Sequence, residues 1–216
     1  MRTKTLLLAA VLSAAGVASS LAQVYSVNAV GYVNVTLDAG LSLICNPLKN
    51  TAGNQLNNIL PLTDADAGTT IYMFNGTGFG NSTYLGTAVG WTPNSTVAPG
   101  QGIFISLAAG KTITFVGEVP QGTDSNLHMN AGLSLISSPV PQSLALDAMG
   151  FPADAGDTVY FYRGTGGSKA YASSTFLGTG VGWLPAAVPA VGEGFWVSRN
   201  AAADWNRNFS DRKSVV

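Results

Sequence analysis

The residues that could carry out catalysis or bind a metal are few and scattered in this 216-residue sequence. His128 is the only histidine, and Cys45 is the only cysteine. A zinc site needs several Cys, His or carboxylate ligands close together. A serine hydrolase triad would have to use His128, and the sequence has no Gly-x-Ser-x-Gly turn to present a nucleophile. We therefore expect no metal site and no catalytic triad.

Acidic side chains suggest two weaker alternatives. Glu118 and Glu193 are the only glutamates, and glycoside hydrolysis needs two carboxyl groups about 5–10 Å apart across a cleft. They lie in non-equivalent parts of the repeat described below, which argues against a catalytic pair. Oxygen ligands for calcium could come from Asp64, Asp66, Asp154 and Asp157. Aspartate also stabilises turns through its own backbone, and we favour that role.

Two glycine-rich segments, 76–80 and 178–182, superficially resemble phosphate-binding loops. A phosphate loop requires a following helix whose N-terminus meets the anion. Neither segment continues into a convincing helix, so we expect no nucleotide and no other cofactor.

Trp91 and Trp183 form the only binding hypothesis with some support. Each follows Val-Gly and precedes x-Pro, so the two occupy equivalent places. A flat aromatic face suits a sugar ring, but it suits core packing equally well. Exposed indoles would favour a carbohydrate-binding module with two sites, whereas buried indoles would indicate that each Trp fills the core of its own unit.

The charge composition excludes several partners. Only 10% of residues are charged, against roughly 25% in an average soluble domain. Between residues 23 and 210, six basic and ten acidic side chains give a net charge of −4 with His128 neutral. A chain with this net negative charge is unsuited to binding nucleic acid or an anionic membrane surface. Cys45 allows no intrachain disulfide; it is expected to be a buried apolar residue, with an intermolecular disulfide as the alternative.

Both ends of the sequence are set apart from the expected fold. Arg2 and Lys4 precede an apolar stretch that is too short to span a bilayer, and Ser20-Leu21-Ala22 offers a small-x-small cleavage site. We expect a secretory signal peptide over 1–22, cleaved near Ala22, and no transmembrane span. The charged segment 211–216 permits a reverse translation that resembles a sequencing-adapter oligonucleotide, so we expect a non-native tail there.

An internal repeat is the most informative feature of the sequence. Five blocks recur in the same order, at an offset of 92 positions or, for the second and third blocks, 88 positions: 39–44 with 131–136, 66–72 with 154–160, 76–78 with 164–166, 84–91 with 176–183, and 100–106 with 192–198. This order indicates duplication of one module.

The repeated blocks have the character of strands. The segments 71–74, 103–105, 159–162 and 195–197 are short, aromatic or β-branched, and bounded by turn residues. Alternating apolar residues also predict strands over 27–37 and 112–119. Since 30–33 resembles 116–119, we expect the strand at 112–119 to end one unit and begin the next. Helical spacing within 54–60, and a similar stretch at 143–149, predict one short helix in each unit.

Three motifs carry a resemblance to a group of secreted bacterial tandem-repeat proteins. They are the opening Ser-Val-Asn-Ala-Val-Gly-Tyr-Val-Asn-Val-Thr at 26–36, the Ala-Gly-x-Ser-Leu-Ile block, and the Pro-Gly-x-Gly-Phe-Phe-Val block, here seen in variant form at 99–105. The resemblance covers nearly all of 23–210 and implies export and a β-rich fold. The group has no established activity, so it implies no site.

Together these observations predict an all-β protein of two homologous tandem units, sandwich-like or barrel-like, at 23–118 and 119–210. We expect it to be secreted or bound to the cell surface and to act without catalysis, as a structural or adhesive protein. Its partner is unknown, and an extracellular glycan or a second copy are the classes considered. The alternative function is a carbohydrate-binding module that uses Trp91 and Trp183.

Overall fold

The computed structural model describes residues 30–210, so the expected signal peptide and C-terminal tail lie outside the described residues. Unit 1 contains β1 Val30–Leu37, β2 Gly40–Cys45, α2 Leu56–Ile59, η2 Asp64–Asp66, β3 Thr70–Phe74, β4 Phe79–Tyr84, β5 Trp91–Thr92, β6 Gly102–Leu107 and β7 Lys111–Glu118. Unit 2 contains η3 Thr123–Ser125, β8 Leu127–Met129, β9 Gly132–Ile136, β10 Thr158–Arg163, η4 Gly166–Ser168, β11 Ala170–Phe176, β12 Trp183–Leu184, β13 Phe195–Arg199 and β14 Ala203–Trp205.

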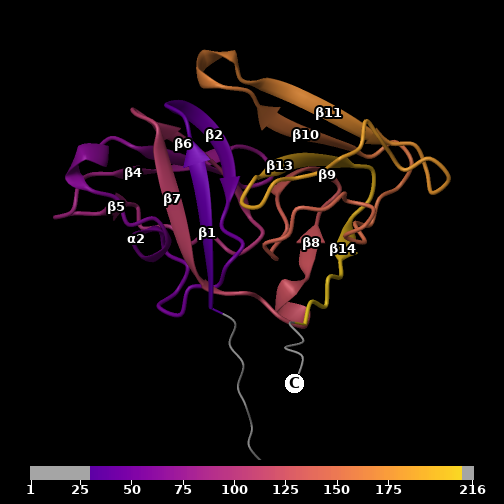
Figure 1. Cartoon of the computed structure of the whole chain (residues 1–216), viewed down its shortest axis with the longest axis horizontal. Helices are drawn as coiled ribbons and strands as arrows, with labels where there is room; N and C mark the ends of the chain where they lie inside the picture. The colour runs from indigo at the N-terminus through magenta and orange to yellow at the C-terminus, as the bar shows by residue number, and fades with distance from the viewer. Residues whose placement is uncertain (1–29, 211–216) are drawn as a thin grey trace, which may run out of the picture.

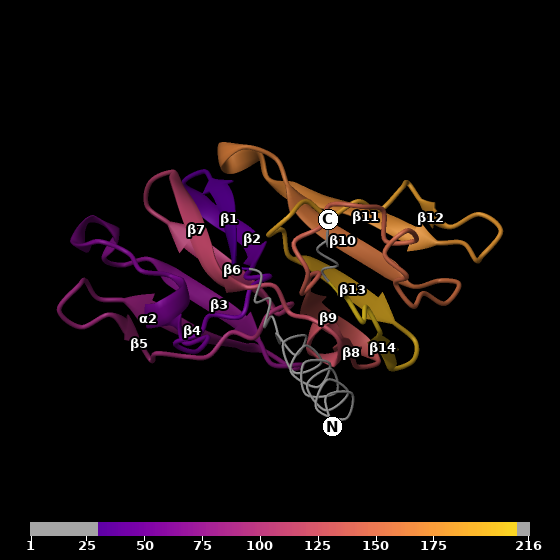
Figure 2. The same ribbon diagram turned by 60° about the horizontal axis from the view of Figure 1, so that its bottom comes forward.

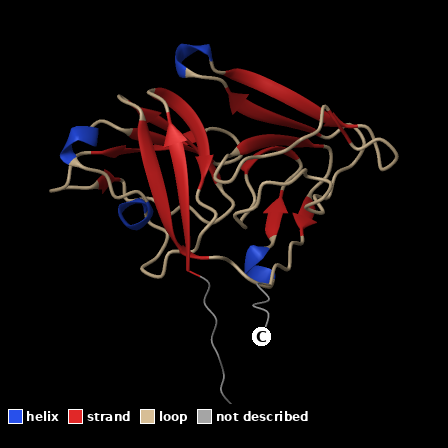
Figure 3. Ribbon diagram, viewed as in Figure 1, coloured by secondary structure: helices blue, strands red, loops and turns tan. Residues whose placement is uncertain are grey.

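Each unit is a two-layer sandwich of antiparallel strands. A five-stranded sheet has the order β2-β6-β3-β4-β5 in unit 1 and β9-β13-β10-β11-β12 in unit 2. A two-stranded ribbon, β1-β7 or β8-β14, covers one face of that sheet (Figures 1 and 3). The prediction of an all-β protein with two similar units is confirmed. Within each unit, the strands enclose one apolar core.

The alternation of side chains explains why the ribbon β1-β7 forms. Along β7, Ile113 and Phe115 are buried. Thr112, which precedes them, and Thr114, which lies between them, are exposed. This period-two pattern is that of a strand with one face on the core and one in solvent. Gly117 lets another segment approach closely, because a Cβ there would lie 2.5 Å from the Lys49 carbonyl oxygen.

The two units contact each other through equivalent residues. The amide of Cys45 donates to the carbonyl of Gly192, and the amide of Ser137 donates to the carbonyl of Gly100. Cys45 and Ser137 are 92 positions apart, as are Gly100 and Gly192. When residue i of one copy contacts j of the other and the reverse also holds, the interface is isologous and its symmetry two-fold. The units therefore face each other about an approximate two-fold axis (Figure 2).

Two sequence-based predictions need correction. The strand β7 does not begin unit 2; it pairs with β1 along its whole length, with Gly31 opposite Gly117. The similarity of 30–33 to 116–119 thus reflects two pairing partners in one ribbon rather than two copies of one strand. The first strand of unit 2 is β8, which pairs with β14 in the register that β1 shares with β7.

The second correction concerns the helix of unit 2. Unit 1 has α2, but the predicted helix at 143–149 is a turn. One helical bond forms, from the amide of Met149 to the carbonyl of Ala145. Gly150, at φ 63°, then closes the turn, and the amide of Phe151 bonds back to the carbonyl of Leu146. This is the closing pattern of a helix C-terminus, reached here after a single turn.

Candidate functional site

The two repeated tryptophans lie in the cores of their units. Trp91 is 2% exposed and Trp183 is 4% exposed. Their rings pack in the same way, with centroids 5.6 Å from Tyr84 and 5.5 Å from Phe176. The Trp91 Nε1 donates to the Leu60 carbonyl. Neither indole presents a face to a ligand, so a sugar site built on these two residues does not fit the structure.

The acidic residues considered for chemistry have structural contacts with other protein residues. Asp64 accepts hydrogen bonds from the amide and hydroxyl of Thr87, which hold the pKa of Asp64 below its ordinary value. The carboxylate of Glu193 accepts two hydrogen bonds from Arg163, at 2.6 Å each, and one from the amide of Ala190. Glu118 lies at the end of β7, where its backbone pairs with Lys49. The two glutamates are therefore placed in different structural roles.

The aspartates considered as calcium ligands also include Asp66 and Asp157, and both side chains contact other protein residues. Asp66 accepts from Thr63 and Lys111, and Asp157 accepts from the amide of Asp154 and pairs with Arg199. The bonds from Thr63 and from the amide of Asp154 are the turn roles expected of aspartate, whereas the pairs with Lys111 and Arg199 join residues far apart in the sequence. No cluster of three or more His, Cys, Asp or Glu suited to a metal occurs within residues 30–210.

His128 and Cys45 have separate environments. His128 Nδ1 lies 2.6 Å from Asp204 Oδ1 on the neighbouring strand, and both side chains are largely exposed. Cys45 is fully buried, and burial raises the pKa of its thiol to about 12. This environment matches the expectation of a buried apolar residue.

The glycine-rich segments also form turns. The segment 76–80 covers most of the β3–β4 turn and the first two residues of β4, and 178–182 follows β11. Neither leads into a helix.

A different group of aromatic residues lies on an exposed face. In the sheet of unit 2, Val159 and Val197 point into the core, so their neighbours along β10 and β13 point outward. The outward residues line a groove of about 450 Å³: Leu133, Tyr160, Tyr171, Trp196 and Ser198. This volume lies within the roughly 300–1,000 Å³ of small-molecule sites. The groove crosses β9, β13, β10 and β11.

The groove combines ring faces with polar atoms and has no charged lining residue. Tyr171 and Leu133 are 53% and 51% exposed. Trp196 Nε1 lies 3.3 Å from the Tyr171 hydroxyl, to which it donates. From unit 1, Phe74 supports the indole edge-on at a centroid distance of 4.9 Å. The indole is thus held in place before any ligand arrives.

Unit 1 differs from unit 2 at two of the five groove positions: it has Phe79 and Phe104 for Tyr171 and Trp196, and matching residues at the other three. Phe74, Phe79 and Phe104 correspond to Tyr162, Tyr171 and Trp196, as the strand pairings of both sheets show. Phe104 is buried, and Phe79 packs against Phe74 and Phe104. Both units use this face for packing between the units, and unit 2 adds a hydroxyl or an indole N–H at each of the three positions.

Sequence reasoning did not identify the groove residues. The signal was present in the aligned repeats, because Phe79 and Phe104 of the first copy are replaced by Tyr171 and Trp196 in the second. What the sequence does not show is which face of the sheet these rings occupy, since short strands that pack on both faces lack clear alternation.

No family model matches the chain, and no curated protein or solved structure matches it. The resemblance to secreted tandem-repeat proteins therefore stays a prediction based on its motifs. Among residues 30–210, no helix has the length and apolar character needed to cross a membrane.

Proposed function

We propose that this protein is an exported, non-enzymatic adhesive protein that holds a neutral extracellular glycan in the aromatic groove of unit 2. The observation that carries the proposal is the replacement of Phe79 and Phe104 by Tyr171 and Trp196, two of the residues that line this groove. Aromatic rings offer large apolar area together with a polar handle. A sugar ring needs both, because its C–H face is apolar and its rim carries hydroxyls.

The uncharged lining favours a neutral ligand. A charged glycan or an acidic peptide buried against Leu133 and Tyr160 would lose hydration without an opposite charge to compensate. The groove continues into the aromatic contacts between the units, through Trp196 and Phe74. The platform is therefore carried by strands and braced from the other unit, which gives a rigid surface suited to adhesion.

The test is binding of purified protein to soluble neutral polysaccharides, by isothermal titration calorimetry and affinity electrophoresis. Trp196→Ala is expected to cost about 2 kcal/mol, the scale of a hot-spot aromatic residue, which is roughly thirtyfold in Kd. A Tyr171→Phe, Trp196→Phe double variant recreates the residues of unit 1 and is expected to weaken binding while leaving the fold intact.

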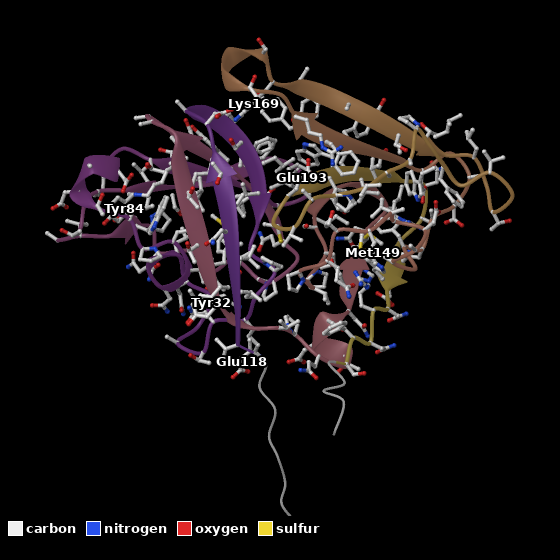
Figure 4. All side chains as sticks on the ribbon, in the orientation of Figure 1. Tyr32, Tyr84, Glu118, Met149, Lys169 and Glu193 are labelled. Atoms are coloured by element: carbon white, nitrogen blue, oxygen red, sulfur yellow. The ribbon has the colours of Figure 1, made fainter. Side chains whose placement is uncertain are left out.

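Tyr32→Ala provides the matched control, since Tyr32 is 71% exposed on the outer face of β1 and lies outside the groove (Figure 4). It should bind as wild type does. If no polysaccharide binds, or if Trp196→Ala and Tyr32→Ala bind equally, the groove is not a glycan site. Concentration-dependent sedimentation would then favour a second copy of the chain as the partner.

A further inference from the structure

A second, more polar pocket adjoins the aromatic groove. It has a volume of about 480 Å³ and lies where the β3–β4 turn of unit 1 faces β9 of unit 2. Its lining includes Phe74, Asn75, Gly76, Asn130 and Leu133. Leu133 also lines the aromatic groove, and Phe74 contacts Trp196. The two hollows therefore share a wall. The aromatic groove is lined mainly by rings, and the polar pocket is lined mainly by amides and backbone.

The approximate two-fold axis places an equivalent pocket on the other side of the interface. That pocket, of about 220 Å³, is lined by the corresponding parts of β2 and the end of β10, including Ser42, Tyr162 and Gly164. Lys169 lines it as well; its Nζ donates to the Leu41 carbonyl and to the Ser42 hydroxyl (Figure 4).

The difference between the two pockets comes from hairpin length. The repeat offset rises from 88 to 92 between β10 and β11, so this hairpin has four residues more than the β3–β4 hairpin. The extra residues lie around η4 and Lys169, where the chain reaches β2, and the Gly166 amide also bonds to Asp38. The shorter β3–β4 hairpin has no such extension. The polar pocket beside the aromatic groove therefore stays larger than its counterpart.

We infer that the aromatic groove and the adjoining polar pocket form one extended site, and that its ligand is a linear neutral glycan chain crossing from unit 2 to unit 1. This inference rests on the proposed function. One sugar ring stacks in the aromatic groove, and the next rings lie along Leu133 toward the amides of Asn75 and Asn130. Amides both donate and accept hydrogen bonds, which suits vicinal sugar hydroxyls. The occupant is a neutral chain because neither hollow is lined by a charged side chain.

The test is a chain-length series on the full protein. Mono-, di-, tetra- and hexasaccharides of the neutral polysaccharide that binds best are titrated by calorimetry. Affinity should rise by about tenfold once the chain reaches the polar pocket, which corresponds to one or two added hydrogen bonds. Asn75→Asp keeps the acceptor that holds Thr77 and Gly78 in the turn but removes the amide donor. Together with Asn130→Ala, it should abolish the gain for long chains and leave the affinity for the disaccharide unchanged.

Trp196→Ala should weaken all lengths alike, and Asn34→Ala, on the outer face of β1, should weaken none. If every length binds with the same affinity, or if the Asn75 and Asn130 variants affect short and long chains equally, the extended site is wrong while the glycan function stands. If no length binds at all, the proposed function itself has failed.

Discussion

Phe104 and Trp196 occupy equivalent positions in the two units and contact each other across the interface, with ring centroids 6.3 Å apart. Each also contacts the partner of the other: Phe104 packs on Tyr162, and Trp196 packs on Phe74. Tyr162 and Phe74 are themselves equivalent, so the contacts are reciprocal. The pairing of the units therefore depends on a small aromatic cluster near the two-fold axis.

Replacing Phe104 by Ala is expected to lower the free energy of unfolding by about 3–5 kcal/mol and to separate the unfolding of the units. Phe104 is 5% exposed and lies between the two sheets. Differential scanning calorimetry should show a broadened or split transition. Phe79→Ala, at a ring that is 50% exposed, is the control and should change the profile less. An unaltered single transition for Phe104→Ala would mean that the cluster does not couple the units.

The buried ion pair of unit 2 gives a second prediction. The side chains of Arg199 and Asp157 are 1% and 0% exposed, with Nη1 and Oδ2 3.0 Å apart. Arg199→Leu leaves Asp157 buried without its cation, which typically costs about 3–5 kcal/mol. Leu107 and Thr69 hold these positions in unit 1. The double variant Arg199→Leu, Asp157→Thr copies that pair.

Urea unfolding of the four proteins in this double-mutant cycle measures the coupling between the two residues. The double variant should be more stable than Arg199→Leu alone. If the two substitutions are additive, the ion pair has no energetic coupling and the prediction is wrong.

Asp66 should make stability depend on acid. Burial raises the pKa of Asp66, but hydrogen bonds from Lys111 and Thr63 outweigh burial, and the pKa lies below its ordinary value of 3.8. A carboxyl with a depressed pKa in the folded state contributes stability that is complete above 3.8 and is lost as pH falls through the lower folded-state pKa. The difference in unfolding free energy between wild type and Asp66→Asn should therefore shrink over that acidic range. A difference that stays constant from neutral pH into acid would contradict this account.

Cys45 should be inert toward alkylation in the folded protein. Burial raises the pKa of its thiol to about 12, and only the thiolate reacts. Pulse labelling with iodoacetamide should modify Cys45 only as denaturant unfolds unit 1, with a midpoint matching that of tryptophan fluorescence. Non-reducing electrophoresis of native protein should show monomer. Rapid labelling without denaturant would show that the thiol is accessible and reactive in the folded protein, contrary to this prediction. A disulfide-linked dimer would instead support the intermolecular disulfide.

The sequence predicted most of the fold because the same pattern of residues occurs in both copies of the repeat. Segments such as 71–74 and 159–162 have weak strand signals alone, but the same aromatic pattern in both copies argues for one structure. The turn chemistry of the aspartates was predictable for a similar reason, since an Asp side chain bonds to backbone only a few residues away.

The predictions that were wrong share a physical cause: local sequence does not determine where a segment lies in the folded protein. Segments 30–33 and 116–119 look like copies, yet they are pairing partners in one ribbon, with Gly31 opposite Gly117. The turn at 143–149 has helical spacing, but Gly150 ends it after one turn. Trp91 was a reasonable binding candidate, although its indole fills a core; burial of a large ring depends on the whole sheet.

The near two-fold arrangement has an evolutionary consequence. In a symmetric homodimer, one gene encodes both halves, and a mutation from Phe to Trp at the axis would change both sides of the contact at once. Covalent fusion removes that constraint. Phe104 could be kept for cohesion while its counterpart became Trp196, so the joined chain could specialise one half without weakening the other.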